Sequence, residues 1–227
     1  MKIAIIGKGN LGTHLYDALK SVVSVQWYAR DYPTSMDADL VIVSVSDKET
    51  LEVCERIDAA LVVHTAGIVP QLDRPNAGVL YPLYSFTKGA VVDWVNIPFL
   101  IETAQENNLS ILKETVTLLG AKFYSMSSGQ RTKIHAAAVI VNNFTNHLYT
   151  LAEDYCRDHN LPFEVLHGIM KQGPSKAIEL GAKQAQTGPA IRGDDDTIEN
   201  HLESIRQKEI KELYEHISTS IRNRHEL

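Results

Sequence analysis

The start of the chain constrains its fold more than any other feature, because a short apolar run leads directly into three closely spaced glycines. The run is Lys2–Ile6 (KIAII), the glycines are Gly7, Gly9 and Gly12, and residues 11–19 continue with helical periodicity. A compact apolar run of this kind is typical of a strand buried on both faces of a sheet. We therefore expect a strand, a tight glycine turn and a helix, which together begin a βαβ unit.

Strand-like and helix-like segments alternate over the first 127 residues. The apolar patterns predict strands at residues 2–6, 22–28, 39–45, 61–64, 79–81, 97–102 and 121–125, and helices at 11–19, 48–57 and 109–119. Alternation of this kind indicates a mostly parallel sheet with right-handed crossover connections.

From residue 128 onward the pattern is helical. We expect one helix over residues 132–159, ended by Leu161-Pro162, and two more at 164–171 and 175–186. Residues 187–196 (TGPAIRGDDD) are predicted to form a loop, in which Arg192 either pairs with Asp194 or binds a substrate carboxylate. Asp194 or Asp195 is expected to cap a final helical pair over 197–222.

Composition and charge exclude several classes of protein. The net charge is −6 with no basic stripe, so we expect no nucleic-acid partner. Cys54 and Cys156 are far apart and form no CxxC pair, and the nine histidines show no paired metal spacing, so we predict no metal site and a reducing compartment. No apolar run reaches the roughly 18 residues of a membrane span. A strand that starts at residue 2 leaves no room for a signal peptide, so we expect a cytoplasmic protein without a membrane partner.

The glycine spacing G-x-G-x-x-G has a specific physical meaning when it follows a strand and opens a helix. Gly7 permits the tight turn, Gly9 lets the backbone approach a pyrophosphate, and Gly12 lets the helix pack close to the strand. The backbone N–H groups at the helix start, at Asn10 and Leu11, would then meet the phosphate charge. The pattern predicts a dinucleotide site; the alternative is a glycine turn without a ligand.

The end of the second predicted strand discriminates between the two nicotinamide dinucleotides. An acidic residue there is typical of NAD sites, and an arginine is typical of NADP sites because it binds the 2′-phosphate. The strand ends WYAR, so Arg30 occupies this position and NADP is favoured over NAD. Asp31 follows immediately and argues the other way. The alternative for Arg30 is a solvated surface charge.

Ligands of open parallel sheets lie outside the carboxyl ends of the strands. The residues at these ends are Ser44, Val45 and Ser46 after the third strand, and His64, Thr65 and Gly67 after the fourth. We expect all six to contact the dinucleotide. Thr65 can hydrogen-bond to it, and Gly67 would let backbone lie close to the nicotinamide ring. The alternative for His64 is a histidine satisfied inside the protein.

The first part of the long predicted helix carries polar residues among apolar ones. At about 100° per residue, His135, Val139, Asn142 and Asn146 share one stripe, with Asn143 beside it. Amides and imidazoles are costly to bury without partners, so this stripe is expected to face a ligand. Imidazole exchanges a proton near neutral pH, which makes His135 the candidate proton donor, with Asn142 and Asn143 orienting a substrate. The alternative is that these residues join the helix to the sheet or to a second copy.

The chain resembles the Rossmann-like NADP oxidoreductases that carry a C-terminal helical domain of unknown function. This group is related to the 3-hydroxyacid and 6-phosphogluconate dehydrogenases and to ketopantoate and pyrroline-5-carboxylate reductases. The resemblance rests on IAIIGKGNLGTHL at 3–15, VVHTAG at 62–67, YPLYSF at 81–86, IPFLIE at 97–102, HAAAVIVNN at 135–143 and TGPAIRGD at 187–194.

The resemblance implies an NADP cofactor and a homodimer formed through the helical domain. The hydroxyacid dehydrogenases have an Asn-Asn pair that Asn142-Asn143 matches, and a catalytic lysine one turn earlier. Here Val139 stands at the lysine position, which is a departure from that group.

We therefore predict an α/β protein with an N-terminal Rossmann-type, mostly parallel sheet domain at residues 1–127 and an all-helical domain at 128–227. Its expected function is NADP(H)-dependent hydride transfer between nicotinamide and a small carbonyl or imine substrate. The alternatives are a dinucleotide-binding sensor or scaffold without turnover, which Val139 favours, and a deazaflavin-linked NADP oxidoreductase.

Overall fold

The computed structural model describes residues 1–225 and divides into two compact units. The first unit is Met1–Val141, and the second begins at Asn142. The change from strands to helices comes earlier, at the start of helix α4 (Ser128–Ala138), so the first unit includes this helix as well as the sheet.

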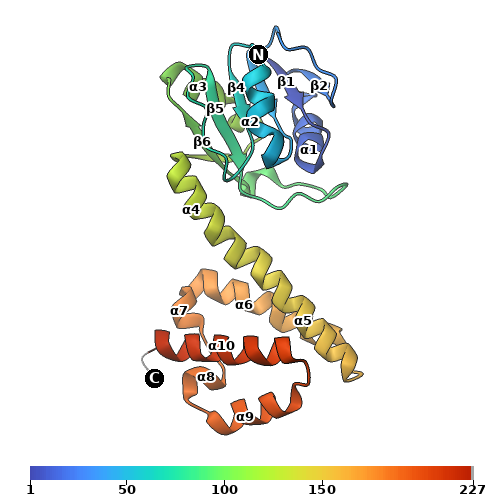
Figure 1. Ribbon diagram of the computed structural model, residues 1–227, viewed down its shortest axis with the longest axis vertical. Coiled ribbons are helices and arrows are strands. Elements are labelled where there is room, and N and C mark those ends of the chain that lie inside the picture. Colours follow the sequence, from blue (N-terminus) through green and yellow to red (C-terminus); the bar gives the residue numbers. More distant parts are fainter. Residues whose placement is uncertain (226–227) are drawn as a thin grey trace. The chain divides into compact units, whose positions relative to one another are not determined.

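The first unit is built around a seven-stranded sheet with the strand order β2-β1-β3-β4-β5-β6-β7 (Figure 1). Neighbouring strands are parallel except for β5 and β6, which are antiparallel. This confirms the predicted mostly parallel sheet. The strands are β1 (Lys2–Ile6), β2 (Ser24–Tyr28), β3 (Leu40–Val43), β4 (Val62–His64), β5 (Ala77–Pro82), β6 (Pro98–Thr103) and β7 (Lys122–Ser125), and the helices between them are α1 (Asn10–Leu19), α2 (Asp47–Arg56), the short 3-10 turn η1 (Trp94–Asn96) and α3 (Glu106–Leu118).

Both faces of the sheet are covered, as the apolar strand sequences require. Ile3 and Ile5 of β1 pack into one core with α1 and α3, while Ala4 and Ile6 pack into another with α2. Alternate residues of one strand therefore enter opposite cores. This is why the strands read as continuous apolar runs and not as alternating ones.

The connections leave an open crevice at one edge of the sheet. From β1 the chain crosses through α1 to β2 on one side, and then passes to β3 on the other side of β1. Where the strand order reverses in this way, the loops after the two diverging strands separate and leave room for a ligand. The loops at this point are the glycine turn after β1 and Ser44–Ser46 after β3.

The predicted helix over 132–159 is helical over a longer stretch and is not uniform. It starts at Ser128 because Ser127 and Gln130 form a capping box, in which the Ser127 side chain accepts from the Gln130 N–H. It also contains a π turn, η2 (Val139–Phe144), before α5 (Thr145–Asp158). A π turn holds more residues than an α turn, so the single stripe assumed at 100° per residue is wrong across residues 139–144.

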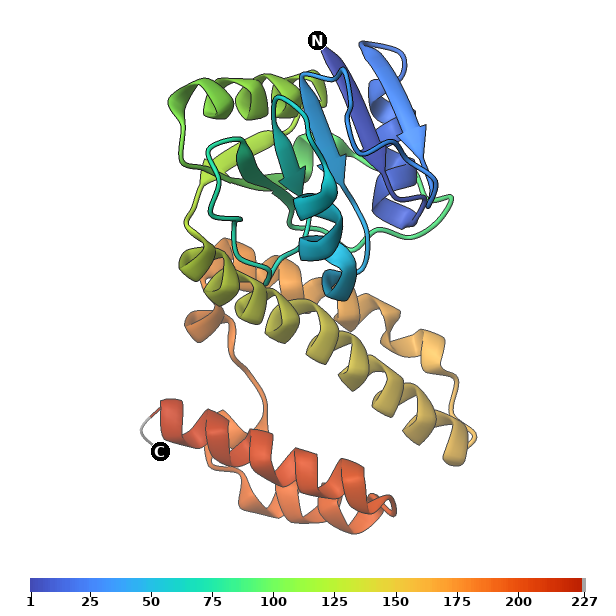
Figure 2. The ribbon, with the colours of Figure 1, turned by 45° about the horizontal axis from the view of Figure 1, so that its top comes forward.

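The rest of the second unit is helical up to residue 225, and the structure corrects several predicted bounds. The predicted helix over 175–186 is interrupted at Gly181, which has φ +84°. The predicted break between 171 and 175 is absent, and the helix continues through Pro174 although proline lacks the N–H for one backbone hydrogen bond. The predicted loop contains a short helix that starts at Pro189, whose fixed φ suits the first helical position. The elements are η3 (Phe163–Leu166), α6 (His167–Leu180), α7 (Ala182–Ala185), α8 (Pro189–Arg192), α9 (Asp195–Ser204) and α10 (Lys208–Arg224), of which α9 and α10 form the hairpin that Figure 2 shows.

Asp194 caps α9, as predicted. Its carboxylate accepts a hydrogen bond of 3.2 Å from the Thr197 N–H, and hydrogen bonding by the Thr197 side chain, followed by this backbone contact, holds the pKa of Asp194 below its usual range. Arg192 lies 3.5 Å from the same carboxylate. Of the two partners predicted for Arg192, the structure shows the Asp194 carboxylate.

The glycine turn supports a matched pair of stability tests. Gly7 has φ +116°, and a Cβ there would lie 1.9 Å from the Ser44 carbonyl oxygen, whereas a Cβ on Gly9 would meet nothing within 4 Å. We expect Gly7→Ala to lower the free energy of unfolding by about 2–4 kcal/mol through backbone strain and overlap. Gly9→Ala should change it by about 0.5 kcal/mol or less. Urea unfolding followed by circular dichroism measures both, and equal losses would contradict the structure of the turn.

Candidate functional site

The loops at the reversal of strand order enclose a cleft of about 810 Å³ in the first unit. Its lining includes basic side chains such as Arg30 and Arg56 and acidic side chains such as Asp47 and Glu49. Nine of the predicted cofactor residues lie in its wall: Gly7, Gly9, Asn10, Leu11, Arg30, Ser44, Val45, Ser46 and Thr65. The sequence analysis therefore located most of one continuous cleft, although the residues come from four different loops.

The glycine turn is held from both sides by backbone and side-chain contacts. The Gly7 N–H donates to the Tyr28 carbonyl at 3.0 Å, and the Gly7 carbonyl accepts from the Trp27 indole N–H at 3.0 Å. Gly12 packs so closely that a Cβ there would lie 2.2 Å from the Gly7 carbonyl oxygen. The turn and the start of α1 are thus locked together at a spacing that only glycine permits.

The first turn of α1 is suited to an anion. Gly9 precedes the helix, no side chain caps it, and its first turn contains no acidic residue. The backbone N–H groups at Asn10 and Leu11 therefore lack intrahelical partners, and the helix dipole adds partial positive charge there. Because a Cβ on Gly9 would meet nothing within 4 Å, this position has room for a phosphate group.

Arg30 lies exposed at the end of β2, in the cleft wall, and makes no salt bridge with any residue that the structure describes. Asp31, the residue that argued for NAD, is not among the lining residues.

Tyr32 and Arg56 also line the cleft, and sequence reasoning missed both. No sequence signal singles them out, because they reach the cleft only once the β2–β3 connection and α2 are packed.

His64 lies outside the cleft lining and is satisfied by its own loop. Its side chain is fully buried, Nδ1 accepts from the Ala66 N–H at 3.2 Å, and Nε2–H donates to the Pro70 carbonyl at 3.1 Å. Burial lowers the pKa of His64 to about 4, so the ring is neutral near pH 7. Both ring nitrogens are hydrogen-bonded within the loop, so His64 matches the alternative of a histidine satisfied inside the protein.

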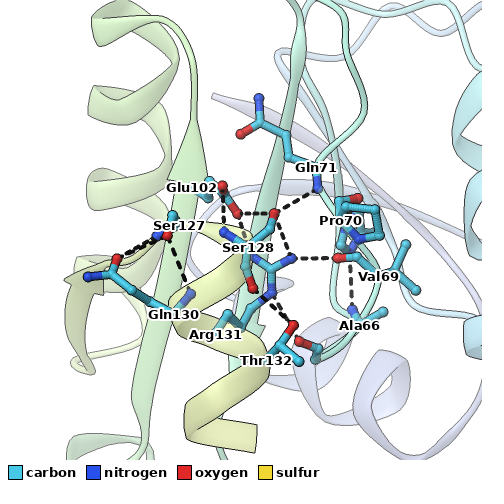
Figure 3. Close-up of polar contacts among 12 residues, drawn as sticks. Ala66, Val69, Pro70, Gln71, Glu102, Ser127, Ser128, Gln130, Arg131 and Thr132 are labelled. Atoms are coloured by element: carbon cyan, nitrogen blue, oxygen red, sulfur yellow. Dashed lines mark hydrogen bonds and ion pairs between the residues drawn. The ribbon is translucent and has the colours of Figure 1, made fainter.

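A buried arginine fastens α4 to the loop that follows β4 (Figure 3). The Arg131 side chain is 1% exposed, and its guanidinium pairs with Glu102 and donates to the Gly67 carbonyl at 3.2 Å and to the Val69 carbonyl. Ser128 completes the cluster, because its N–H and its hydroxyl each donate to Glu102 at 2.7 Å. Sequence reasoning missed this cluster, since nothing in the local pattern relates Arg131 to Glu102.

His135 lies one turn beyond Arg131, directly over Gly67. Its Nδ1 is 3.0 Å from the Tyr81 hydroxyl, and a Cβ on Gly67 would lie 2.7 Å from the same nitrogen. His64 pairs with Val79 in the β4–β5 register, so Tyr81 and Gly67 both lie just beyond it at the carboxyl edge of the sheet. The structure thus brings together two predicted site residues, His135 and Gly67, and Tyr81, the first residue of the YPLYSF segment at 81–86.

Asn142 and Asn143 lie in η2, in the second unit, and both are exposed. Asn146 is exposed as well. That these exposed amides face a ligand stays a prediction.

Side chains of α1 hold the loop that follows β5. Asn10 donates from Nδ2 to the Phe86 carbonyl at 2.9 Å, and His14 donates from Nε2 to the Thr87 carbonyl at 2.9 Å. The end of the YPLYSF segment at 81–86 is thereby tied to the helix that follows the glycine turn.

Over residues 1–225, no group of three histidine, cysteine, aspartate or glutamate side chains is placed to hold a metal ion. No helix in this range is long and apolar enough to cross a membrane.

Residues 97–221 match the domain of unknown function DUF2520, which covers more than half of the chain. The structure is similar to that of a putative NADP oxidoreductase, BF3122, from Bacteroides fragilis, with 36% identity, a TM-score of 0.85 and coverage of 100% of this chain and 98% of that one. The chain belongs to the DUF2520 family. No match is found among curated proteins.

Other solved structures share the fold of this DUF2520 protein at lower sequence identity. Protein TM1727 from Thermotoga maritima is 22% identical, with a TM-score of 0.77 and coverage of 99% of this chain and 98% of that one. The imine reductase from Myxococcus stipitatus, solved in complex with NADP+, is 14% identical, with a TM-score of 0.63 and coverage of 98% and 93%. At these identities the likeness establishes the fold alone.

The internal bonding of His64 makes the stability of this DUF2520 protein depend on pH. The unfolded histidine binds a proton at a pKa of about 6.5, and the buried ring does so only at about 4. Between pH 6.5 and pH 4 the unfolded chain binds more protons at this histidine than the folded chain does. The contribution of the neutral ring to the free energy of unfolding is therefore fully present above about pH 6.5. It falls by about 3 kcal/mol as the pH drops toward 4. Urea unfolding at several pH values should show a shallower fall for His64→Gln. Parallel curves would contradict this role of His64.

Proposed function

We propose that this protein is an NADP(H)-dependent oxidoreductase that transfers hydride between nicotinamide and a small carbonyl or imine substrate. The observation that carries the proposal is the cleft itself. It runs from Arg30 past the open face of Gly9 to Thr65 and Ala66, and His135 lies over the next residue, Gly67. The full-length similarity to BF3122 from Bacteroides fragilis, which is described as a putative NADP oxidoreductase, supports the same class.

The cleft residues fit a dinucleotide from end to end. Gly9 leaves space for the pyrophosphate, and the N–H groups of Asn10 and Leu11 would hold it. Arg30, which has no ion-pair partner in the described chain, would bind a 2′-phosphate, and this favours NADP over NAD. When bound, the nicotinamide supplies the hydride.

His135 is proposed as the proton donor for the carbonyl oxygen or imine nitrogen. It is half-buried at the strand edge, close to Gly67, and an imidazole can give and take a proton near neutral pH. This placement supports turnover over the alternative of a sensor, because a purely binding protein does not need an acid–base group at this edge. Asn142 and Asn143 are proposed to orient the substrate, on the basis of their amide chemistry.

The first test is calorimetric titration of the protein with NADPH and NADH. We expect NADPH to bind more tightly, because Arg30 adds a charge-assisted contact to the 2′-phosphate. Arg30→Ala should weaken NADPH binding by about 10- to 100-fold, which corresponds to about 1.5–3 kcal/mol, and leave NADH binding nearly unchanged.

His135→Ala is the matched control for this titration. It should keep NADPH affinity while losing NADPH oxidation with a small cyclic imine such as 2-methyl-1-pyrroline or with a small aldehyde. If neither nucleotide binds at millimolar concentration, the oxidoreductase proposal is wrong. If both variants bind like wild type and NADPH is preferred, Arg30 is not the discriminating residue.

We also propose that the chain forms a homodimer through its second unit. Within that unit, up to residue 225, only Cys156 and Ala190 are buried. A groove of about 700 Å³ between α5, η3, α9 and α10 is lined mainly by apolar side chains, and Leu161 and Val165 in it are 53% and 69% exposed. A helical unit with so little of its apolar surface covered needs a partner of similar size and character, and a second copy supplies one.

The homodimer is tested by light scattering on size-exclusion chromatography. We expect a mass of about twice the 25.3 kDa of the chain. Val165→Asp should shift the protein toward monomer, because it places a charge in the apolar groove. The control is Val91→Asp, at a side chain that is 97% exposed in the first unit, and it should leave the dimer intact. A monomeric wild type would contradict the proposal.

A further inference from the structure

The pair formed by Tyr81 and His135 carries a further inference, which rests on the proposed function of the site. The two side chains come from different parts of the fold, the end of β5 and the second turn of α4, and meet with 3.0 Å between the hydroxyl and Nδ1. Their rings lie edge to face with centroids 6.0 Å apart. The hydrogen bond therefore fixes the direction in which the imidazole faces.

The backbone of Gly67 closes off the Nδ1 side of this pair. A Cβ on Gly67 would lie 2.7 Å from Nδ1, 3.0 Å from the Tyr81 ring carbon Cζ and 3.2 Å from the hydroxyl. Nothing larger than a hydrogen atom fits between Gly67 and the pair, so no substrate atom can reach Nδ1 there. No described residue hydrogen-bonds to the other ring nitrogen, Nε2.

Arg131 holds both sides of this arrangement together. Its guanidinium donates to the Gly67 carbonyl, and its own backbone belongs to the α4 turn that precedes His135. Because Arg131 is buried and paired with Glu102, the distance between Gly67 and His135 is set by a rigid contact and not by a surface side chain.

We propose that Tyr81 is a positioning residue that accepts a hydrogen bond from Nδ1–H of His135 and thereby makes Nε2 the nitrogen that exchanges a proton with the substrate. A neutral imidazole has one N–H and one lone pair. If the Tyr81 hydroxyl donated to Nδ1, the proton of the neutral ring would sit on Nε2 and no lone pair would remain for the substrate side.

The protonation state of the Tyr81 phenol agrees with this role. Burial raises the pKa of the Tyr81 phenol and the negative charge of Asp47 adds to the effect, while Arg131 opposes it. Tyr81 therefore remains a neutral phenol near pH 7, and its oxygen can accept the hydrogen bond from Nδ1–H of His135.

The proton balance of the reduction follows from this geometry. The nicotinamide, when bound, would supply a hydride to the substrate carbon, and the π pair of the C=O or C=N bond would move to the oxygen or nitrogen. That atom takes the proton from Nε2–H of the imidazolium. The ring is left neutral with its remaining proton on Nδ1, still bonded to Tyr81, and Nε2 is reprotonated from water.

The decisive experiment is ¹⁵N NMR of the cofactor-free protein with labelled histidine, at alkaline pH where the imidazole is neutral. We expect His135 to show a protonated Nδ1 and an unprotonated Nε2. In Tyr81→Phe the acceptor is lost, so the two resonances should shift toward the opposite tautomer. Tyr124→Phe, which removes an exposed phenol elsewhere, should leave them unchanged.

A second variant keeps the test independent of any loss of packing in Tyr81→Phe. Gly67→Ala forces the imidazole away from Tyr81 through the 2.7 Å overlap, and it should shift the resonances in the same direction. A wild-type His135 with its proton on Nε2, or a Tyr81→Phe spectrum identical to wild type, would overturn the inference.

The NMR measurement needs neither cofactor nor substrate, so its outcome is separate from that of the proposed function. Calorimetry that shows no NADPH binding would refute the oxidoreductase proposal, while the spectra would still decide whether Tyr81 sets the tautomer. NADPH binding together with an unchanged tautomer would refute the role of Tyr81 alone.

Discussion

The buried guanidinium of Arg131 is the contact on which the arrangement of the site depends. A charge at 1% exposure is costly to desolvate, and it persists here because Glu102 neutralises it and two backbone carbonyls accept from it. Those carbonyls belong to Gly67 and Val69, in the loop that follows β4. The ion pair thus joins β6, α4 and that loop, and it determines where His135 lies relative to the sheet edge.

The second constraint is the close approach of the glycine turn to β3. Gly7 lies against the Ser44 carbonyl and Gly12 lies against Gly7, so three backbone segments converge where only glycine leaves enough room. This convergence opens the N-terminus of α1 toward the cleft and leaves the space beside Gly9 unfilled. The cleft therefore has partial positive charge at the N-terminus of α1, and its lining ends at Thr65 and Ala66, next to the Gly67 that packs against Tyr81 and His135.

The two units differ in how they bury apolar surface. The first unit has a core on each face of its sheet, whereas the described part of the second unit buries two residues and leaves an apolar groove open. Burial of apolar area is the main favourable term in folding. The described part of the helical unit therefore leaves apolar surface uncovered, which is the reason for proposing a second copy as its partner, while the sheet unit has a core on each face of its sheet.

The sequence by itself determined the sheet, the glycine turn and most of the cleft wall, because these features depend on local periodicity and on residues that follow strands directly. It also singled out His135 and Gly67. Only the tertiary structure decided the partners of His135 and His64, the burial of Arg131 and the π turn at 139–144. Arg131 and Glu102, like Tyr81 and His135, are far apart along the chain, and no local pattern encodes which long-range pairs will meet. Side-chain pairing across elements is set by packing, which the sequence pattern of each element does not contain.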